Sequence, residues 1–372
     1  MKSSTWVRRN LAGGVVCYKS VSRQISGILR NPFFQKRIFS LKNQVYATQG
    51  SLNSFMIPKQ GEKQATNQES NINSESNNLQ RTVNEFWDKV NTNYNEESKQ
   101  YEVQLDGKNM KTPFGNTLAF PQGKKHLAHL VAYEWQSLPA LQSKIHSMPI
   151  TSLAARSIDL HETNKTNKPE PEKMAQIGNL EDIHKNISRY LDTDTCLVFA
   201  TSDEYEGQLR RKQEQLYLPL IKEFEDYFSA YAKSRGMVDD EKVKLTYLDC
   251  EKDGLRGNRQ TSSTRSVILR WMEELSTFQL VALEKAVLNT KSFMCGFSLL
   301  RSNCSDPLLM KHLFQLNKTQ GDYFYKSVEE IVELANLETI FQTNEWGEVE
   351  DTHDVDKVDW LRNLSSAAIV AF

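Results

Sequence analysis

A chain of 372 residues, 39% hydrophobic and 25% charged, has the composition of a globular protein with one large core or two smaller ones. No stretch approaches the roughly 18 to 20 consecutive apolar residues of a membrane-spanning helix, so the sequence predicts no membrane span. The net charge of −1 is unevenly distributed: the first 61 residues carry ten basic residues and no acidic one, and the remainder has 36 basic against 47 acidic residues. This acidic remainder disfavours nucleic acid as a partner, because phosphate binding requires an excess of lysine and arginine.

The N-terminal 48 residues are typical of a mitochondrial transit peptide. Their basic residues are interleaved with Ser, Val, Leu, Ile and Phe, and the first acidic residue of the chain is Glu62. Such segments exclude carboxylates because the inside-negative membrane potential that helps import draws in cations and opposes anions. The run Arg37-Ile38-Phe39-Ser40 resembles a matrix processing site, so we expect the mature chain to begin near Ser40. A basic tail that binds nucleic acid or acidic lipid is the alternative.

Residues 49–80 are predicted to form a disordered polar linker. They are dominated by Asn, Gln, Ser, Lys and Glu and hold almost no aliphatic side chains. Such a composition cannot bury enough apolar surface to offset the entropy lost on ordering.

Residues 81–145 predict a small β-rich domain with one covering helix. Tyr101, Val103 and Leu105 alternate with polar residues, and Asp106-Gly107 supplies a tight hairpin turn directly after them. After Pro121 the apolar period becomes helical through Leu127, Leu130, Val131 and Trp135.

Residues 146–372 predict an α-helical domain that ends in an acidic recognition segment. Helical periodicity is found around Ile183 to Leu191, from Tyr205 to Arg235, and in three segments between Ser263 and Leu316. Pro219 is expected to end or kink the long second stretch, and the charged insert from Glu162 to Lys173 is expected to be a loop. The fold class is therefore α+β, with a small N-terminal antiparallel β domain followed by a larger α-helical domain.

The usual short signatures of nucleotide-binding, zinc-protease and serine-hydrolase sites are missing from the sequence, so we predict no cofactor and no enzymatic activity. The densest polar cluster runs from Glu345 to Asp354. One interpretation is a divalent metal site, but the run lacks the alternating oxygen ligands of a calcium loop. The other interpretations are a solvated acidic turn and a charged recognition surface. Trp346 beside Gly347 favours recognition, because a partly exposed tryptophan is a typical interface anchor.

Four blocks of sequence together resemble one family, the F1 ATPase assembly chaperones that escort the alpha subunit. The first is the hairpin Leu105-Asp106-Gly107-Lys108 with Lys111-Thr112-Pro113, and the second is Leu127-Ala128, Val131-Ala132 and Glu134-Trp135. The third is Met148-Pro149-Ile150-Thr151-Ser152-Leu153-Ala154 with Ile158-Asp159, continued by Tyr190 and Asp194-Thr195-Cys196. The fourth is Glu338 and Gln342 followed by Trp346-Gly347-Glu348-Val349-Glu350-Asp351-Thr352-His353-Asp354. Their order and spacing carry the resemblance.

The resemblance implies a chaperone that binds the free F1 alpha subunit and prevents its aggregation. We expect it to be a monomer and, from the transit peptide, to be in the mitochondrial matrix. The residues expected to contact the partner or to support that contact are Glu338, Trp346, Glu350 and Asp351, with Glu134 and Trp135 as second choices. Two other functions stay open. One is a matrix enzyme whose acid/base pair is Glu350 or Asp351 with His353, and the other is a constitutive subunit of a respiratory complex.

Overall fold

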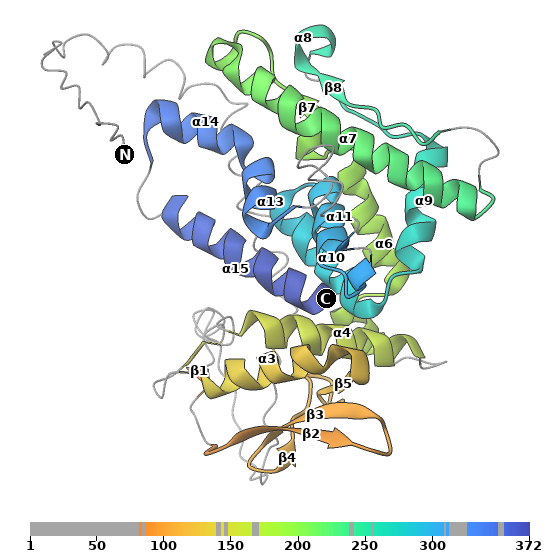
Figure 1. Cartoon of the computed structure of the whole chain (residues 1–372), viewed down its shortest axis with the longest axis vertical. Coiled ribbons are helices and arrows are strands. Elements are labelled where there is room, and N and C mark those ends of the chain that lie inside the picture. The colour runs from red at the N-terminus through yellow and green to blue at the C-terminus, as the bar shows by residue number, and fades with distance from the viewer. Residues whose placement is uncertain are drawn as a thin grey trace, which may run out of the picture. The chain divides into compact units, whose positions relative to one another are not determined.

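The computed structural model describes residues 82–83, 87–138, 143–144, 148–165, 171–237, 242–254, 256–308, 310–311, 326–348 and 353–372 (Figure 1). The predicted transit peptide (1–48) and linker (49–80) lie outside the described residues, and so do Glu350 and Asp351. No helix in the described ranges is long and apolar enough to cross a membrane.

A small antiparallel sheet forms near the N-terminus of the described chain. Its strands are β2 (Val90–Asn95), β3 (Gln100–Leu105), β4 (Lys108–Asn109) and β5 (Ala119–Pro121). The central strand β3 pairs with β2 on one side and with β4 and β5 on the other. The predicted hairpin turn is present, because Asp106 and Gly107 both have positive φ angles, 49° and 79°. This combination defines the tight turn that best matches the twist of paired strands.

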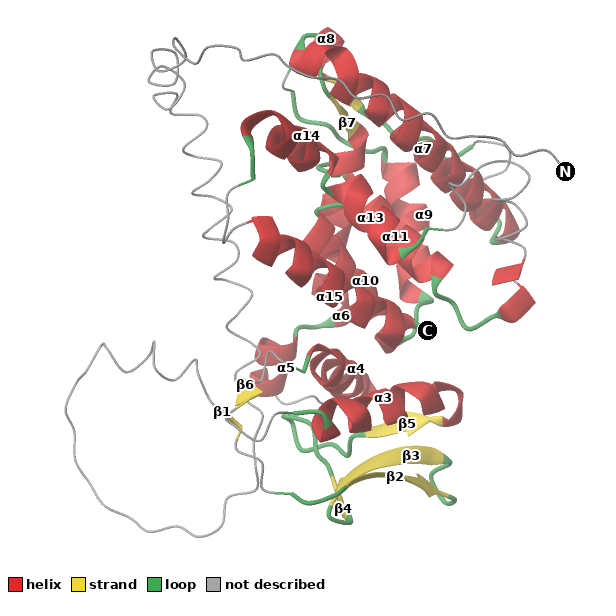
Figure 2. Cartoon of the chain, turned by 60° about the vertical axis from the view of Figure 1, so that its left-hand side comes forward, coloured by secondary structure: helices red, strands yellow, loops and turns green. Residues whose placement is uncertain are grey.

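Helix α3 (Lys125–Gln136) covers one face of this sheet (Figure 2). Its buried residues are Leu127, Ala128, Val131 and Trp135, which recur at the helical spacing read from the sequence. Next to it, β1 (Thr82–Val83) pairs with β6 (Ser143–Lys144).

The rest of the described chain is mostly helical. Its α-helices are α4 (Pro149–Lys165), α5 (Pro171–Ile177), α6 (Leu180–Ser188), α7 (Gln208–Ser234), α8 (Cys250–Asp253), α9 (Ser262–Glu273), α10 (Thr277–Thr290), α11 (Phe293–Ser302), α13 (Val328–Ala335), α14 (Leu337–Trp346) and α15 (His353–Ala371). Short 3-10 helices are η2 (Gln122–Lys124), η4 (Arg189–Leu191), η5 (Thr195–Leu197) and η6 (Glu204–Gly207), and β7 (Val198–Phe199) pairs in parallel with β8 (Leu248–Asp249). The α+β fold class is confirmed.

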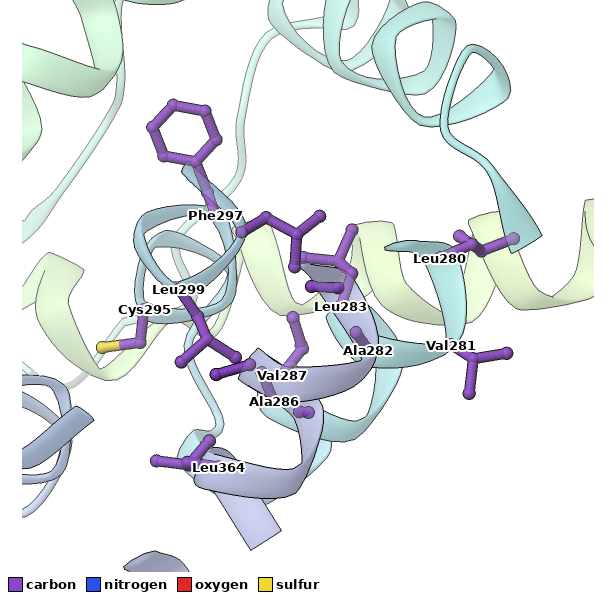
Figure 3. Packing of buried hydrophobic residues seen from close by; sticks show 14 of the residues in the cluster. Leu280, Val281, Ala282, Leu283, Ala286, Val287, Cys295, Phe297, Leu299 and Leu364 are labelled. Atoms are coloured by element: carbon purple, nitrogen blue, oxygen red, sulfur yellow. The ribbon is translucent and has the colours of Figure 1, made fainter. Parts of the chain in front are cut away.

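Helix α10 lies at the centre of the helical core and contacts α4, α11 and α15 (Figure 3). Its Leu283 and Val287 side chains are fully buried against α11. The two helices approach so closely that a Cβ atom on Gly296 would lie 2.7 Å from the Cγ2 atom of Val287. The absence of a side chain at Gly296 therefore sets the distance between α10 and α11.

The loop that follows the β-hairpin is tied to the helical core through α4. The carboxylate of Asp159 is buried and accepts hydrogen bonds from the Thr112 hydroxyl and from Asn116 Nδ2, the latter at 2.7 Å. Burial raises the pKa of Asp159, although these donors favour its ionised form. A second link joins α4 to α10 through the ion pair between Arg156 and Glu284 at 2.8 Å.

Three details of the helical prediction differ from the structure. Helix α7 continues through Pro219 to Ser234, so the proline does not end it, and the alternative of a kink stays a prediction. The segment from Glu162 to Lys173 is not a loop throughout, because α4 extends to Lys165 and α5 begins at Pro171. The long helix also begins later than predicted, since Tyr205 precedes it in a different conformation.

Candidate partner-binding surface

Helix α14 presents a mixed acidic and aromatic face. Glu338, Phe341, Gln342 and Glu345 follow one another at the spacing i, i+3, i+4 and i+7, which places them on one side of the helix. Trp346 ends the helix, and 71% of its surface is exposed. A tryptophan this exposed contributes little to the core, and exposed aromatic residues are typical anchors of interfaces.

Tyr205 packs against this face from the segment that precedes α7. Its ring centroid lies 5.7 Å from that of Phe341 and 6.3 Å from that of Trp346. The side chain of Gln342 lies near its hydroxyl. Burial raises the pKa of Tyr205, and the nearby carboxylates of Glu338, Glu345 and Glu204 raise it further.

The backbone around Tyr205 is strained. Tyr205, Glu206 and Gly207 have φ angles of 51°, 53° and 71°, so three consecutive residues adopt the left-handed conformation. For residues other than glycine this costs roughly 1–2 kcal/mol each. Such strain persists where the surroundings impose it and often marks functional segments. Here it accompanies the placement of the Tyr205 ring on α14.

The acidic face of α14 has no ion-pair partner in the described part of the chain. Among those residues, no lysine or arginine forms an ion pair with Glu204, Glu338 or Glu345, and Glu338 accepts a hydrogen bond only from Gln342, at 3.2 Å. The last turn of α14 holds Glu345 and no basic residue. A helix C-terminus already carries partial negative charge and is stabilised by cations, so this surface has an unusually negative potential.

Glu134 and Trp135 hold the start of α4. The carboxylate of Glu134 accepts hydrogen bonds from Ile150 N at 3.0 Å, Thr151 N at 2.7 Å and Thr151 Oγ1 at 2.5 Å. These backbone amides belong to the first turn of α4 and have no partner within the helix. Trp135 is buried, and its Nε1 donates to Thr151 Oγ1 at 3.2 Å. Both side chains are therefore engaged by contacts with α4 within the fold.

We expect Glu134→Ala to lower the free energy of unfolding by about 2 kcal/mol, because it leaves buried donors of α4 without a charged acceptor. Glu134→Gln keeps one acceptor oxygen and should lose less. Chemical denaturation of the three proteins measures the difference. A loss under about 0.5 kcal/mol for alanine, the size of an ordinary surface substitution, would contradict this role.

The other residues singled out in the sequence lie elsewhere or outside the description. His353 starts α15, but its side chain is not described, so its pairing with Glu350 or Asp351 stays untested. His129 Nδ1 lies 3.0 Å from Thr92 Oγ1, while the His126 ring lies against Phe372. Within the described ranges, no three His, Cys, Asp or Glu residues gather as metal ligands would.

No sequence pattern indicates the position of Tyr205. Helical periodicity from Tyr205 onwards predicts one long helix, although Gly207 is a signal of positive φ within it. The contact between Tyr205 and α14 joins residues more than a hundred positions apart, and no local pattern indicates it.

An exposed tryptophan beside carboxylates that have no ion-pair partner among the described residues is typical of a protein-binding surface. The profile of the ATP12 chaperone protein family matches residues 84–225. The chain is 44% identical over 305 residues to Protein ATP12, mitochondrial, from Saccharomyces cerevisiae, covering 82% of this chain and 88% of that protein. It is 32% identical over 286 residues to Protein atp12, mitochondrial, from Schizosaccharomyces pombe, covering 77% and 81%.

A solved structure shares the fold. Atp12 from Paracoccus denitrificans superposes with a TM-score of 0.52 at 19% sequence identity, covering 77% of this chain and 96% of that one. The chain belongs to the ATP12 chaperone family. The resemblance drawn from the four sequence blocks is thereby confirmed, and membership supports a role in the mitochondrion as a chaperone of ATP synthase assembly rather than as an enzyme.

Proposed function

We propose that this protein binds the unassembled alpha subunit of the F1 ATPase in the mitochondrial matrix and covers its assembly face until the beta subunit replaces it. A subunit destined for a permanent complex has a large apolar interface, which aggregates when it is left bare. The observation that carries the proposal is the exposed Trp346 within the unpaired acidic face of α14.

Handover limits how tightly the chaperone can bind. The beta subunit must displace it without nucleotide hydrolysis, so a micromolar to high-nanomolar dissociation constant, about 8–10 kcal/mol, suits the task. A single exposed tryptophan in an acidic rim is compatible with this range, because a few anchors dominate the affinity of most interfaces.

The proposed contacts divide into two groups. Trp346 serves as the anchor, and the carboxylates of Glu338, Glu350 and Asp351 attract basic groups of the alpha subunit and orient it. Glu134 and Trp135 support the fold indirectly by fixing the start of α4.

Co-expression of the full chain with the alpha subunit tests the proposal. We expect alpha to stay soluble and to co-elute with the wild-type chaperone. Glu338→Lys and Trp346→Ala should each weaken the complex by about tenfold or more, through charge repulsion and loss of the anchor respectively.

Two matched variants control for nonspecific effects. Glu96→Lys reverses an exposed carboxylate in the β2–β3 turn, and Tyr133→Ala removes a 65% exposed aromatic ring from α3. Both should bind alpha as the wild type does. If alpha precipitates beside the wild-type chain, the choice of client is wrong. If all four variants hold alpha equally, the α14 face is not the binding surface.

A further inference from the structure

The aromatic rings at α14 contact one another in the unbound chain. Trp346 lies against Tyr205, which also contacts Phe341 and which, with Glu206, has a left-handed backbone. A surface that is already ordered loses little conformational entropy when a partner binds. The strain at Tyr205 is therefore consistent with a preorganised binding surface.

Elsewhere in the same chain, arginine side chains lie between aromatic rings and carboxylates. At three places an arginine lies over an aromatic ring and also pairs with a carboxylate, with 5.0 to 5.6 Å between the guanidinium carbon and the ring centroid. These groups are Arg210 with Phe199 and Asp249, Arg235 with Tyr231 and Glu274, and Arg301 with Tyr227 and Glu223. The guanidinium is suited to both contacts at once, because it is planar, weakly hydrated and forked.

The α14 surface has the ring and carboxylate components of this arrangement without the arginine. Tyr205, Phe341 and Trp346 supply the rings, and Glu204, Glu338 and Glu345 supply the carboxylates. In the described part of the chain, no lysine or arginine lies over these three rings or pairs with these three carboxylates. The C-terminus of α14 adds further negative potential at Trp346.

We propose that these six residues, termed the aromatic–carboxylate site, receive an arginine side chain that the client presents from an apolar segment. The inference rests on the proposed function and names the chemistry by which the same surface selects its partner. The guanidinium lies over Tyr205 or Trp346 and pairs with a carboxylate of α14, as the three internal arginines do. The exposed ring of Trp346 contacts the apolar residues on either side of it.

The spacing along α14 argues for side-chain recognition rather than for a bound metal ion. Glu338 and Glu345 are seven residues apart, a rise of about 10 Å along the helix. A single metal ion bound at 2.0–2.6 Å cannot bridge carboxylates that are separated in this way. An arginine needs only one of them, with its stem lying along the rings between them.

A pair of capped pentapeptides tests this inference apart from the client. One has a single arginine between leucines, and the other has citrulline, which keeps the shape of arginine and removes its charge. The readout is the indole N–H resonance of Trp346 in the full chain, assigned with Trp346→Phe. We expect the arginine peptide to shift this resonance in a saturable way and the citrulline peptide to bind at least about fivefold more weakly.

Variants separate the ring of Tyr205 from its hydroxyl and the carboxylates of the site from general acidity. Tyr205→Leu, Glu338→Gln and Glu345→Gln should each weaken binding of the arginine peptide by about threefold to fivefold. Tyr205→Phe keeps the ring and should bind nearly as the wild type does, and Glu96→Gln should have no effect. Thermal denaturation of each variant checks that it is folded.

The outcomes distinguish the two proposals. Equal responses to both peptides, or none, would overturn the arginine site even if the alpha subunit is held. A selective response to arginine that is weakened in Glu338→Gln and in Glu345→Gln supports the site, even where alpha fails to co-elute and the client must be sought elsewhere. If alpha is held and the same variants weaken that complex about tenfold, the arginine belongs to alpha.

Discussion

Phe228→Ala is expected to lower the free energy of unfolding by about 3–5 kcal/mol, the range for removing a fully buried aromatic ring. Phe228 is 0% exposed and stands at the centre of an aromatic cluster in the helical core. Its ring centroid lies 4.5 Å from that of Phe224, 5.2 Å from that of Phe297 and 5.4 Å from that of Trp271. These rings come from α7, α9 and α11, so the cavity left by alanine cannot close by the movement of one side chain.

Equilibrium denaturation in urea measures the loss. Tyr247→Ala is the matched control, because Tyr247 is 46% exposed and has one aromatic neighbour, Phe199 at 5.2 Å. It should cost about 1 kcal/mol. If Phe228→Ala costs no more than this control, the cluster does not carry the stability that its burial indicates.

Arg301→Met should also cost about 3–5 kcal/mol near pH 8, because it leaves the Glu223 carboxylate without its partner in the protein interior. Glu223 is buried on α7 and pairs with Arg301 of α11, which also lies over the Tyr227 ring at 5.0 Å. Burial raises the pKa of Glu223 to about 7, while Arg301 and Lys326 oppose that rise.

The pH dependence of this loss has a definite sign. A carboxyl group whose folded pKa is raised stabilises the fold fully below its unfolded pKa, and this contribution is lost as pH rises through about 7. Without Arg301 the pKa of Glu223 should rise further, so the variant should lose more stability at pH 8 than at pH 6. Denaturation at the two pH values measures this.

The double variant Arg301→Met with Glu223→Leu serves as the control. It removes both charges and should recover most of the lost stability, since apolar pairs of similar volume often replace buried ion pairs at no cost. A single variant whose deficit is the same at both pH values would contradict the assignment of the loss to a buried charge.

Short-range pattern was sufficient to predict the β domain. Alternation at Tyr101, Val103 and Leu105 and the turn at Asp106-Gly107 are local signals, and the structure confirms them. The helical period from Leu127 to Trp135 likewise predicted α3. In these segments the residues that determine the structure are neighbours in the sequence.

Pro219 shows where local signals fail. Proline lacks an N–H group and crowds the preceding turn, a cost of about 3 kcal/mol in a helix interior. In α7, however, Tyr217, Leu220 and Ile221 around it are buried in the core. Tertiary packing on both sides of the proline holds the helix together, and no single-sequence propensity includes that term.

The candidate surface was predicted only in part. The family resemblance predicts Glu338 and Trp346 as contact residues. Both lie on α14, and their role in binding stays a proposal. Tyr205 was not named, because its relation to α14 depends on an unusual backbone conformation and on a long-range contact. Hydrophobic periodicity and composition predict neither this backbone conformation nor this contact.

The position of α15 has a consequence for how the protein itself is made. The last helix packs on α4 and α10, and Lys124 Nζ donates to the carbonyl oxygen of Val370 at 2.8 Å. A chain that emerges with its N-terminus first therefore cannot complete its core until α15, His353–Ala371, has emerged. Until then α4 and α10 expose the apolar faces that α15 will cover. During its own biogenesis, this chaperone passes through the same aggregation-prone condition from which it is proposed to protect its client.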